Sequence, residues 1–415
     1  MNDSKFKPQV LKLESRALPT AGISLTAGVL TIEGTNGNDR IFIEPVPQHP
    51  TQIVAVLQTG MTVTTRTYAK SAVNSIVVRG MGGDDAILNN VAINMMADGG
   101  PGNDTIWGGY AHDTLLGGDG NDVLIARGVS DSLDGGAGND TLFAGHGEDT
   151  LMGGLGDDVL VGGSGHDFLN GGDGNDSLFG GTGPETLWGG AGNDYLHAGT
   201  GNQSLASGIG DDTLIGGTGN DTLDGGDGND KLWGGHGNNL LAGGPGNDTI
   251  LGGVGNDTIW GGDGNDLIAA GTGNDSIDGG AGNDSIFSSV GNDTILGGAG
   301  DDQIVVKAGN NYVDGGAGND SIWGGSGHDT LLGGLGDDYI QAGSGPTTIY
   351  GNAGNDTLLA GSGNCYIDGG DGADSIWGGT GISTLLGGAG NDIIVGGTQH
   401  HDVIDGGLGT NQIWM

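Results

Sequence analysis

The sequence is poor in cysteine and in basic residues, and it has no long apolar run. Cys365 is the one cysteine in 415 residues, so no disulfide can form within the chain. Eleven Lys or Arg stand against 52 Asp or Glu, giving a net charge of −41. Nucleic acid and anionic membrane surfaces are therefore poor partners, and cations are good ones. No stretch approaches the roughly 18 apolar residues of a membrane-spanning helix, so we expect no membrane span.

Motifs of common catalytic sites are also missing from the sequence. It contains no His-Glu-x-x-His, no Gly-x-Ser-x-Gly and no Gly-Lys-Ser/Thr phosphate loop. Cys365 has no histidine close to it in the sequence that would act as its base. We therefore predict no catalytic residues, and a protein that is not an enzyme.

Glycine, in contrast, is abundant, with 98 residues, and it recurs at a fixed period. From Gly99 to Val395 the phrase Gly-Gly-x-Gly-x-Asp-x-aliphatic-x fills 297 residues, or 33 frames of nine, without an insertion. Such a period indicates a solenoid. Position eight is Leu or Ile in every frame except one, which has Val313, and this predicts an aliphatic row facing a core. Positions seven to nine are expected to form a very short strand, and the first six residues a tight turn.

The phrase resembles the nonapeptide of the RTX, or haemolysin-type, calcium-binding repeats. The resemblance covers about three quarters of the chain. It implies an all-β fold, a parallel β-roll (β-solenoid) of 18-residue turns with two frames in each turn. It also implies multiple Ca²⁺ ions, each held between one loop and the loop 18 residues later by both Asp side chains and by loop carbonyls. Oxygen ligands of this kind suit calcium better than zinc or copper.

Alternate frames define two rows of loops, and the first loop row keeps its aspartate throughout. This row has 17 loops, which end at position six on Asp104, Asp122, Asp140, Asp158, Asp176, Asp194, Asp212, Asp230, Asp248, Asp266, Asp284, Asp302, Asp320, Asp338, Asp356, Asp374 and Asp392. We predict that all of them are metal ligands. Sharing between neighbours would give 16 sites.

The second loop row is interrupted. Its predicted metal ligands are the aspartates with an aspartate neighbour 18 residues away: Asp113, Asp131, Asp149, Asp167, Asp257, Asp275 and Asp293. These add about five sites, although Ala111 and Val129 replace the glycine at position four in two of the loops. Asp221 and Asp329 lack such a partner, and the seven other loops end on Glu185, Gln203, Asn239, Asn311, Thr347, Cys365 and Ser383. Every departure falls on this row, which supports an 18-residue turn.

Composition divides the chain into three predicted segments. Residues 1–20 are expected to be a mobile leader, in which Leu13–Pro19 is similar to a short motif of exported bacterial surface proteins. Residues 21–98 contain β-rich runs and are expected to form a short N-terminal β-cap. Residues 99–415 are expected to form the calcium-binding β-roll.

These observations predict a secreted or surface-exposed, non-catalytic calcium-binding protein with a structural or adhesive role. Two aliphatic side chains in each glycine-rich turn make a thin core, so we expect folding to depend on Ca²⁺. Extracellular calcium modules bind at about 10⁻⁴–10⁻³ M, which places folding outside the cell. The partners are calcium ions and, further, a glycan or another surface protein.

Two alternatives remain open. The first is that the chain is the calcium-dependent repeat module of an exported enzyme or toxin. The second is a glycan- or ice-binding adhesin. It would use the threonines Thr182, Thr200 and Thr218 or the aromatic row at position nine, which comprises Trp107, Phe143, Phe179, Trp233, Phe287, Trp323 and Trp377.

Overall fold

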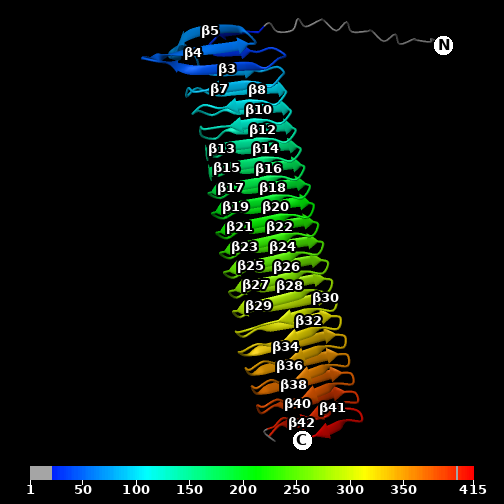
Figure 1. Cartoon of the computed structure of the whole chain (residues 1–415). Coiled ribbons are helices and arrows are strands. Elements are labelled where there is room, and N and C mark those ends of the chain that lie inside the picture. The colour runs from blue at the N-terminus through cyan, green and yellow to red at the C-terminus, as the bar shows by residue number, and fades with distance from the viewer. Residues whose placement is uncertain (1–20, 399–400) are drawn as a thin grey trace, which may run out of the picture.

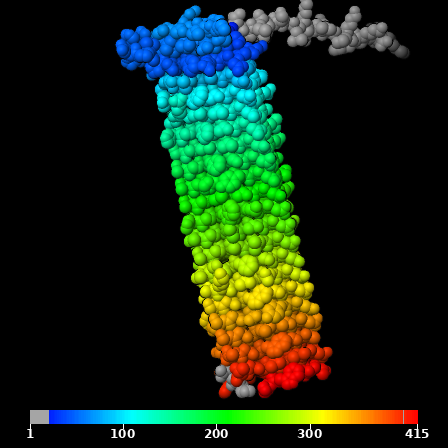
Figure 2. All heavy atoms as spheres, viewed as in Figure 1, coloured from blue at the N-terminus to red at the C-terminus, as the bar shows by residue number. Residues whose placement is uncertain are grey.

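The computed structural model describes residues 21–398 and 401–415 as a long rod of stacked strands (Figure 1). Apart from the three-residue 3₁₀ helix η1 (Lys70–Ala72), the elements in these residues are all β-strands. The rod keeps a nearly constant width below a broader N-terminal end (Figure 2). The described part of the chain contains no helix long and apolar enough to cross a membrane. The leader predicted at residues 1–20 lies outside the described residues.

The strands form two sheets that run the length of the rod. Sheet A consists of β1 (Gly22–Thr26), β2 (Val29–Glu33), β6 (Ser75–Arg79), β8 (Met95–Pro101), β10 (Thr114–Asp119), β12 (Ser132–Ala137), β14 (Thr150–Leu155), β16 (Phe168–Asp173), β18 (Thr186–Ala191), β20 (Ser204–Ile209), β22 (Thr222–Asp227), β24 (Leu240–Pro245), β26 (Thr258–Asp263), β28 (Ser276–Ala281), β30 (Thr294–Ala299), β32 (Tyr312–Ala317), β34 (Asp329–Leu335), β36 (Thr347–Ala353), β38 (Cys365–Asp371), β40 (Thr384–Ala389) and β42 (Val403–Asp405).

Sheet B consists of β3 (Asp39–Val46), β4 (His49–Thr59), β5 (Thr62–Ala69), β7 (Ala86–Asn89), β9 (Thr105–Trp107), β11 (Val123–Ile125), β13 (Thr141–Gly147), β15 (Val159–Gly165), β17 (Ser177–Thr182), β19 (Tyr195–Thr200), β21 (Thr213–Thr218), β23 (Lys231–His236), β25 (Thr249–Val254), β27 (Leu267–Thr272), β29 (Ser285–Val290), β31 (Gln303–Val305), β33 (Ser321–Trp323), β35 (Tyr339–Gln341), β37 (Thr357–Leu359), β39 (Ser375–Trp377), β41 (Ile393–Val395) and β43 (Gln412–Trp414).

Neighbouring strands within the repeats are parallel and lie one turn apart. Leu223 of β22 pairs with Leu241 of β24, and Leu232 of β23 pairs with Ile250 of β25, each 18 residues further along the chain. The predicted parallel β-roll of 18-residue turns is therefore confirmed. Near the C-terminal end the offset becomes 19, with Leu385 paired to Ile404.

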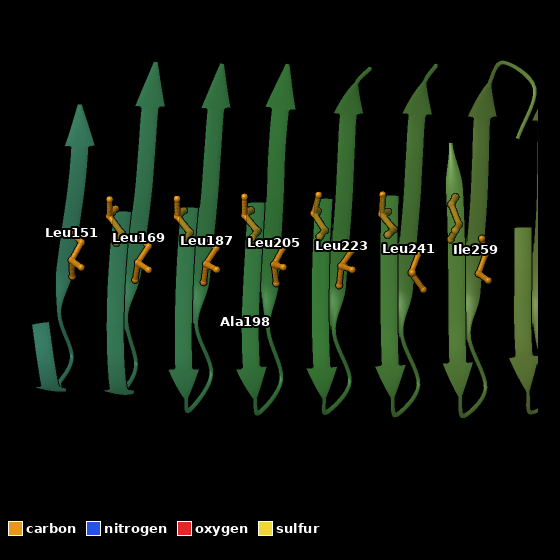
Figure 3. Close-up of a cluster of buried hydrophobic side chains, with 14 of the residues drawn as sticks. Leu151, Leu169, Leu187, Ala198, Leu205, Leu223, Leu241 and Ile259 are labelled. Atoms are coloured by element: carbon orange, nitrogen blue, oxygen red, sulfur yellow. The ribbon is translucent and has the colours of Figure 1, made fainter. Parts of the chain in front are cut away.

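The core is a single aliphatic row from each sheet. The position-eight side chains from Ile106 to Ile394 are at most 2 % exposed. Figure 3 shows part of this row, in which Leu187, Leu205 and Leu223 of sheet A lie in register between the sheets. The prediction that position eight faces the core is confirmed.

The strands are longer than the sequence predicted. Most run for six residues, from position seven through position three of the next frame, and thus include the Gly-Gly pair. The second glycine of the pair has a positive φ, as at Gly226 (+92°), and its backbone still pairs with Gly208 of the preceding turn. Glycine adopts this conformation at little cost, so the ladder continues into what we expected to be turn.

The N-terminal end is closed by antiparallel strands. β1 pairs antiparallel with β2, and β4 joins β3 to β5 in an antiparallel meander at the top of Figure 1. These strands cover the edges that the first parallel coil would otherwise expose. Parallel pairing begins with β2–β6 and β3–β7, and β8 crosses residue 98 without a break. The division into a cap at 21–98 and a roll at 99–415 stays a prediction.

Candidate metal sites

The two loop rows lie at opposite edges of the sheets. Each loop of the first row leads from a strand of sheet A to a strand of sheet B, as the loop ending at Asp230 leads from β22 to β23. Each loop of the second row leads back, as the loop ending at Asp221 leads from β21 to β22. Because the turns are in register, the position-six side chains stack one above another along each edge.

The aspartates of the first row form a ladder through one carboxylate oxygen. The backbone N–H of Asp230 donates to Oδ1 of Asp248, and that of Asp248 donates to Oδ1 of Asp266, both at 2.7 Å. The same bond, at 2.6–3.0 Å, joins every consecutive pair from Asp104 to Asp392. Position six thus satisfies the N–H group of the turn before it, which is one physical reason for a short acceptor side chain there.

The second carboxylate oxygen of each first-row aspartate has no hydrogen-bond partner. All 17 Oδ2 atoms are buried and unpaired, and the Asp230 and Asp248 side chains are 1 % exposed. A buried polar atom without a partner is costly, and a buried charge is costlier still. A row of such atoms indicates that a ligand belongs there.

Burial also changes the acidity of these groups. It raises the pKa of Asp248 from the ordinary 3.8 to about 7, against the opposing effect of the hydrogen bond from Asp230, and the negative charges of Asp266 and Asp230 raise it further. Burial raises the pKa of the other first-row aspartates from Asp104 to Asp374 in the same way. In each of these carboxylates the negative charge is therefore disfavoured by burial, and a bound cation would compensate for that cost.

The glycine at position one makes the space beside the unpaired oxygen. A side chain on Gly225 would collide with Oδ2 of Asp230, and its Cβ would lie 2.6 Å from the carbonyl oxygen of Gly243 in the next turn. The same pair of oxygens borders the space at Gly243, where they come from Asp248 and Gly261. A carboxylate oxygen and a backbone carbonyl thus face a place that glycine leaves open. The exception in the first row is Ser207, in the loop of Asp212, whose hydroxyl donates to the carbonyl of Gly225 at 2.5 Å.

These donors fit calcium. Calcium takes six to eight oxygen ligands in flexible geometry, from carboxylates and backbone carbonyls. Among residues 21–398 and 401–415, no three or more His, Cys, Asp or Glu side chains are grouped to hold a metal ion. A cation between Asp230 and Asp248 would accordingly take its remaining ligands from the backbone or from water. It would neutralise the paired carboxylates and link consecutive turns.

Several predicted ligands of the second row have different surroundings. Oδ2 of Asp113 accepts from the N–H of Gly109 at 2.5 Å, and Oδ2 of Asp131 accepts from that of Gly128 at 3.2 Å, in the two loops that lack glycine at position four. Position one carries a side chain in four of the loops with predicted ligands. These are the loops of Asp131, Asp149, Asp275 and Asp293, where the buried residues are Ala126, Ala144, Ala270 and Ser288.

Asp257 and Asp167 come nearest to the first-row arrangement. Gly252 lies beside Oδ2 of Asp257 and the carbonyl of Ala270, and Gly162 lies beside Oδ2 of Asp167. Both Oδ2 atoms are buried and unpaired. The pairing of Asp257 with Asp275 is the predicted second-row site that the geometry supports best.

Where the second row has lost its acid, neutral side chains supply hydrogen bonds of their own. Oδ1 of Asn239 accepts from the N–H of Asp221 at 3.0 Å, and its Nδ2 donates to the carbonyl of Gly237 at 3.3 Å. Thr347 and Cys365 likewise donate to the position-four carbonyls of their own loops, Gly345 and Gly363, whereas Gln203 donates to that of Gly183 in the preceding turn.

The ladder extends beyond the residues that the sequence predicted. The N–H of Asp39 donates to Oδ1 of Asp85, and the N–H of Asp85 donates to Oδ1 of Asp104, both at 2.7 Å. Each carboxylate also has one buried oxygen without a partner. Gly34 and Gly80 stand five residues before them, as position one does in the repeats. This spacing could have identified Asp39 and Asp85 as candidate ligands from the sequence. They were not included because both loops lie outside the perfect nine-residue register.

Comparison with known proteins agrees with this geometry. A search of the curated proteins found no match. The family model described as the RTX calcium-binding nonapeptide repeat (4 copies) matches residues 97–124, 126–160, 152–184, 171–205, 207–241, 233–268, 242–277, 260–295, 269–304, 296–331, 305–340, 332–364 and 368–400. Together these segments span well over half of the chain. The protein therefore belongs to the RTX calcium-binding nonapeptide repeat family.

Proposed function

We propose that this calcium-binding β-roll is a secreted or surface-exposed structural rod, without catalytic activity, that folds when it binds calcium. The observation that carries the proposal is the row of 17 buried and unpaired Oδ2 atoms in the first loop row. At neutral pH these groups would have to be either protonated or paired with cations. Extracellular calcium is abundant enough for sites of about 10⁻⁴–10⁻³ M, whereas cytosolic calcium is not.

The proposed sites lie between consecutive first-row loops, with Asp230 and Asp248 as a representative pair. One further site lies between Asp257 and Asp275, and one lies at the N-terminal end, at Asp85/Asp104. The pair Asp39/Asp85 is a weaker proposal, because Oδ2 of Asp39 accepts from the N–H and the hydroxyl of Thr35. The remaining second-row sites predicted from sequence are weaker proposals, because their carboxylates accept backbone hydrogen bonds or their position-one residue carries a side chain.

The dependence of folding on calcium follows from charge and core size. Each turn contributes only two fully buried aliphatic side chains, such as Leu223 and Leu232. The same turn brings a first-row carboxylate close to identical charges in the turns above and below. Binding of cations to the folded state alone shifts the equilibrium toward that state.

Far-UV circular dichroism of the full chain tests the proposal directly. In EDTA at neutral pH we expect an unfolded spectrum, and in millimolar calcium a β spectrum, with magnesium at the same concentration as the control. A full β signal in EDTA would refute calcium-dependent folding. Calorimetry of the calcium-induced transition then counts the ions. Detection of the protein in medium, surface and cell fractions of the producing cells tests its location.

Two variants separate ligand loss from simple charge loss. Asp230→Asn removes a buried first-row carboxylate, and Asp224→Asn removes an exposed one from β22, six residues earlier. We expect Asp230→Asn to lower the number of bound ions and raise the calcium concentration needed for folding. Asp224→Asn should change neither. Equal effects of both variants would mean that calcium is only screening the net charge.

A further inference from the structure

Acidic residues are absent from one of the two broad surfaces of the rod. The 18 strands of sheet B from β9 to β43, all within the described residues, contain neither Asp nor Glu. The strands of sheet A from β8 to β42 contain Asp98, Asp119, Asp134, Asp173, Asp224, Asp227, Asp263, Asp278, Asp314, Asp329, Asp368, Asp371 and Asp405. The negative charge of the repeats thus lies on sheet A and on the two loop rows.

The few basic residues of the repeats lie on the same acid-free side. After residue 99 the sequence has three, Arg127, Lys231 and Lys307. Lys231 is exposed in β23, and the other two follow β11 and β31 by two residues. The Arg127 guanidinium lies 5.8 Å from the centre of the Tyr110 ring, and its side chain borders a hollow together with Trp107.

A continuous row, mostly apolar, runs along the outside of sheet B. Position nine of each strand pairs in register with position nine of the next, in the order Trp107, Ile125, Phe143, Val161, Phe179, His197, Ile215, Trp233, Leu251, Ala269, Phe287, Val305, Trp323, Gln341, Leu359, Trp377, Val395 and Trp414. We call this row the sheet B stripe. Several members are well exposed, among them Phe143 (39 %), Phe287 (36 %) and Trp377 (38 %).

The equivalent row on sheet A is interrupted by acidic residues. Its members include Asp134, Asp224 and Asp278, which alternate with residues such as Trp188 and Trp260. Both rows point outward from strands of the same geometry, so the fold alone does not require an acid-free stripe on sheet B. A long exposed apolar stripe on one surface of a soluble protein is characteristic of an interaction site.

We propose that the sheet B stripe is the surface through which two copies of this chain associate side by side. Two rods of net charge −41 repel each other in most orientations. Contact through the loop rows or through sheet A would bring acidic side chains together. Contact through sheet B brings no acidic strand residue to the interface. A two-fold axis places the stripe of one copy on the stripe of the other, which closes the assembly as a dimer.

The available area is sufficient for a stable dimer. From β9 to β43 there are 17 steps of about 4.8 Å, so the stripe is about 80 Å long. Nine of these strands have six or seven residues and are about 20 Å wide, and nine have three residues and are about 10 Å wide, which gives about 1,300 Å² for each copy. A stable interface needs about 800 Å² from each partner. Twisted sheets pack at about 30° to each other, and contact over two thirds of the surface would still be enough.

The inference rests on the proposed function in one respect, because sheet B exists only when the rod is folded. Calcium also lowers the repulsion between the rods. The other occupant that the stripe would suit is a neutral polysaccharide, because aromatic rings stack on sugar rings and the flanking strand positions carry hydroxyls such as Thr213 and Thr249. The uniform in-register stripe and the charge distribution of the rod favour a second copy.

Sedimentation velocity of the full chain in saturating calcium tests the proposal. The same samples are first checked by circular dichroism and calcium calorimetry, so that failure to fold is distinguished from failure to associate. We expect a species of about twice the monomer mass of 41.0 kDa. Trp233→Asp, in the sheet B stripe, should raise the dimer dissociation constant at least tenfold. Trp188→Asp, at the same position on sheet A, should leave it unchanged.

Each other outcome overturns the proposal. A folded, calcium-loaded chain that stays monomeric at high micromolar concentration excludes self-association, and binding of that monomer to insoluble cellulose would assign the stripe to a glycan. A dimer weakened equally by both variants, or by Trp188→Asp alone, would place the interface elsewhere. If Trp233→Asp fails to fold, Thr249→Asp, which lies beside the stripe on β25, replaces it in the same comparison.

Discussion

Replacing first-row aspartates by asparagine should separate the two tasks of the position-six side chain. The triple variant Asp248→Asn, Asp284→Asn, Asp320→Asn changes three residues that are not neighbours in the ladder. Each takes part in two proposed sites, so six ions should be lost. The hydrogen bonds of the first-row ladder would be kept, because the Oδ1 atom of asparagine can accept from the N–H of the preceding turn.

The second loop row supplies the template for this expectation. Asn239 accepts from Asp221 at 3.0 Å and its own N–H donates to Asp257 at 2.8 Å, within an uninterrupted stack of turns. Alanine at the three first-row positions would also remove the calcium ligand, but it would leave the N–H of the preceding turn without an acceptor. An unsatisfied buried N–H costs about 1–3 kcal/mol, which corresponds to roughly 5- to 150-fold faster opening of that amide.

Calorimetry and hydrogen exchange in saturating calcium measure the two effects separately. Both triple variants should bind about six fewer ions. The amides of Asp230, Asp266 and Asp302, which donate to the altered residues, should stay protected with asparagine and exchange faster with alanine. Unchanged ion counts would show that the Oδ2 atoms are not ligands. Equal exchange in the two variants would show that the ladder bond contributes nothing measurable.

Three further predictions address the loops from other directions. In EDTA, lowering the pH from about 8 to about 5 should promote folding, seen as a gain of β signal. Burial raises the pKa of Asp104 and Asp248 to about 7, against about 3.9 in an unfolded chain. Protonation of these carboxyls therefore stabilises the folded state fully below about pH 3.9, and this stabilisation is lost as the pH rises through about 7. Gly225→Ala should remove one ion and Ala270→Gly should add one, by calorimetry. The Cys365 thiol, 5 % exposed and with its pKa raised by burial, should resist maleimide in calcium and react in EDTA.

The periodic features of this rod could be predicted because a stacked turn repeats the same environment. Val313 and its aliphatic counterparts had to face the core, and the unbroken first row of aspartates had to share one edge. The role of position one in the metal site was not recognised, because a glycine there is explained equally well by the need for a turn. The structure shows that its missing side chain leaves space beside Oδ2. Asp39 and Asp85 were not recognised either, because insertions between them and the repeats hide their phase.

The difference in charge between the two sheets could not be predicted from a nine-residue pattern either. The phrase treats Asp224 and Trp233 as the same position, and only the assignment of alternate frames to opposite sheets separates an acidic surface from an acid-free one. The charge contrast appears once strands rather than frames are compared.

The two loop rows together indicate why calcium should be needed along one edge in particular. In the second row, Asn239, Gln203 and Thr347 donate to loop carbonyls, so neutral side chains hold these turns closed without a counter-ion. The first row contains no such substitution among its 17 loops, and every turn there adds another buried carboxylate. The electrostatic cost of the calcium-free state therefore grows with each turn along the first row, while the second row is partly released from it. A rod built in this way would open along the first edge when calcium is withdrawn, with the second edge retaining its neutral hydrogen bonds longest.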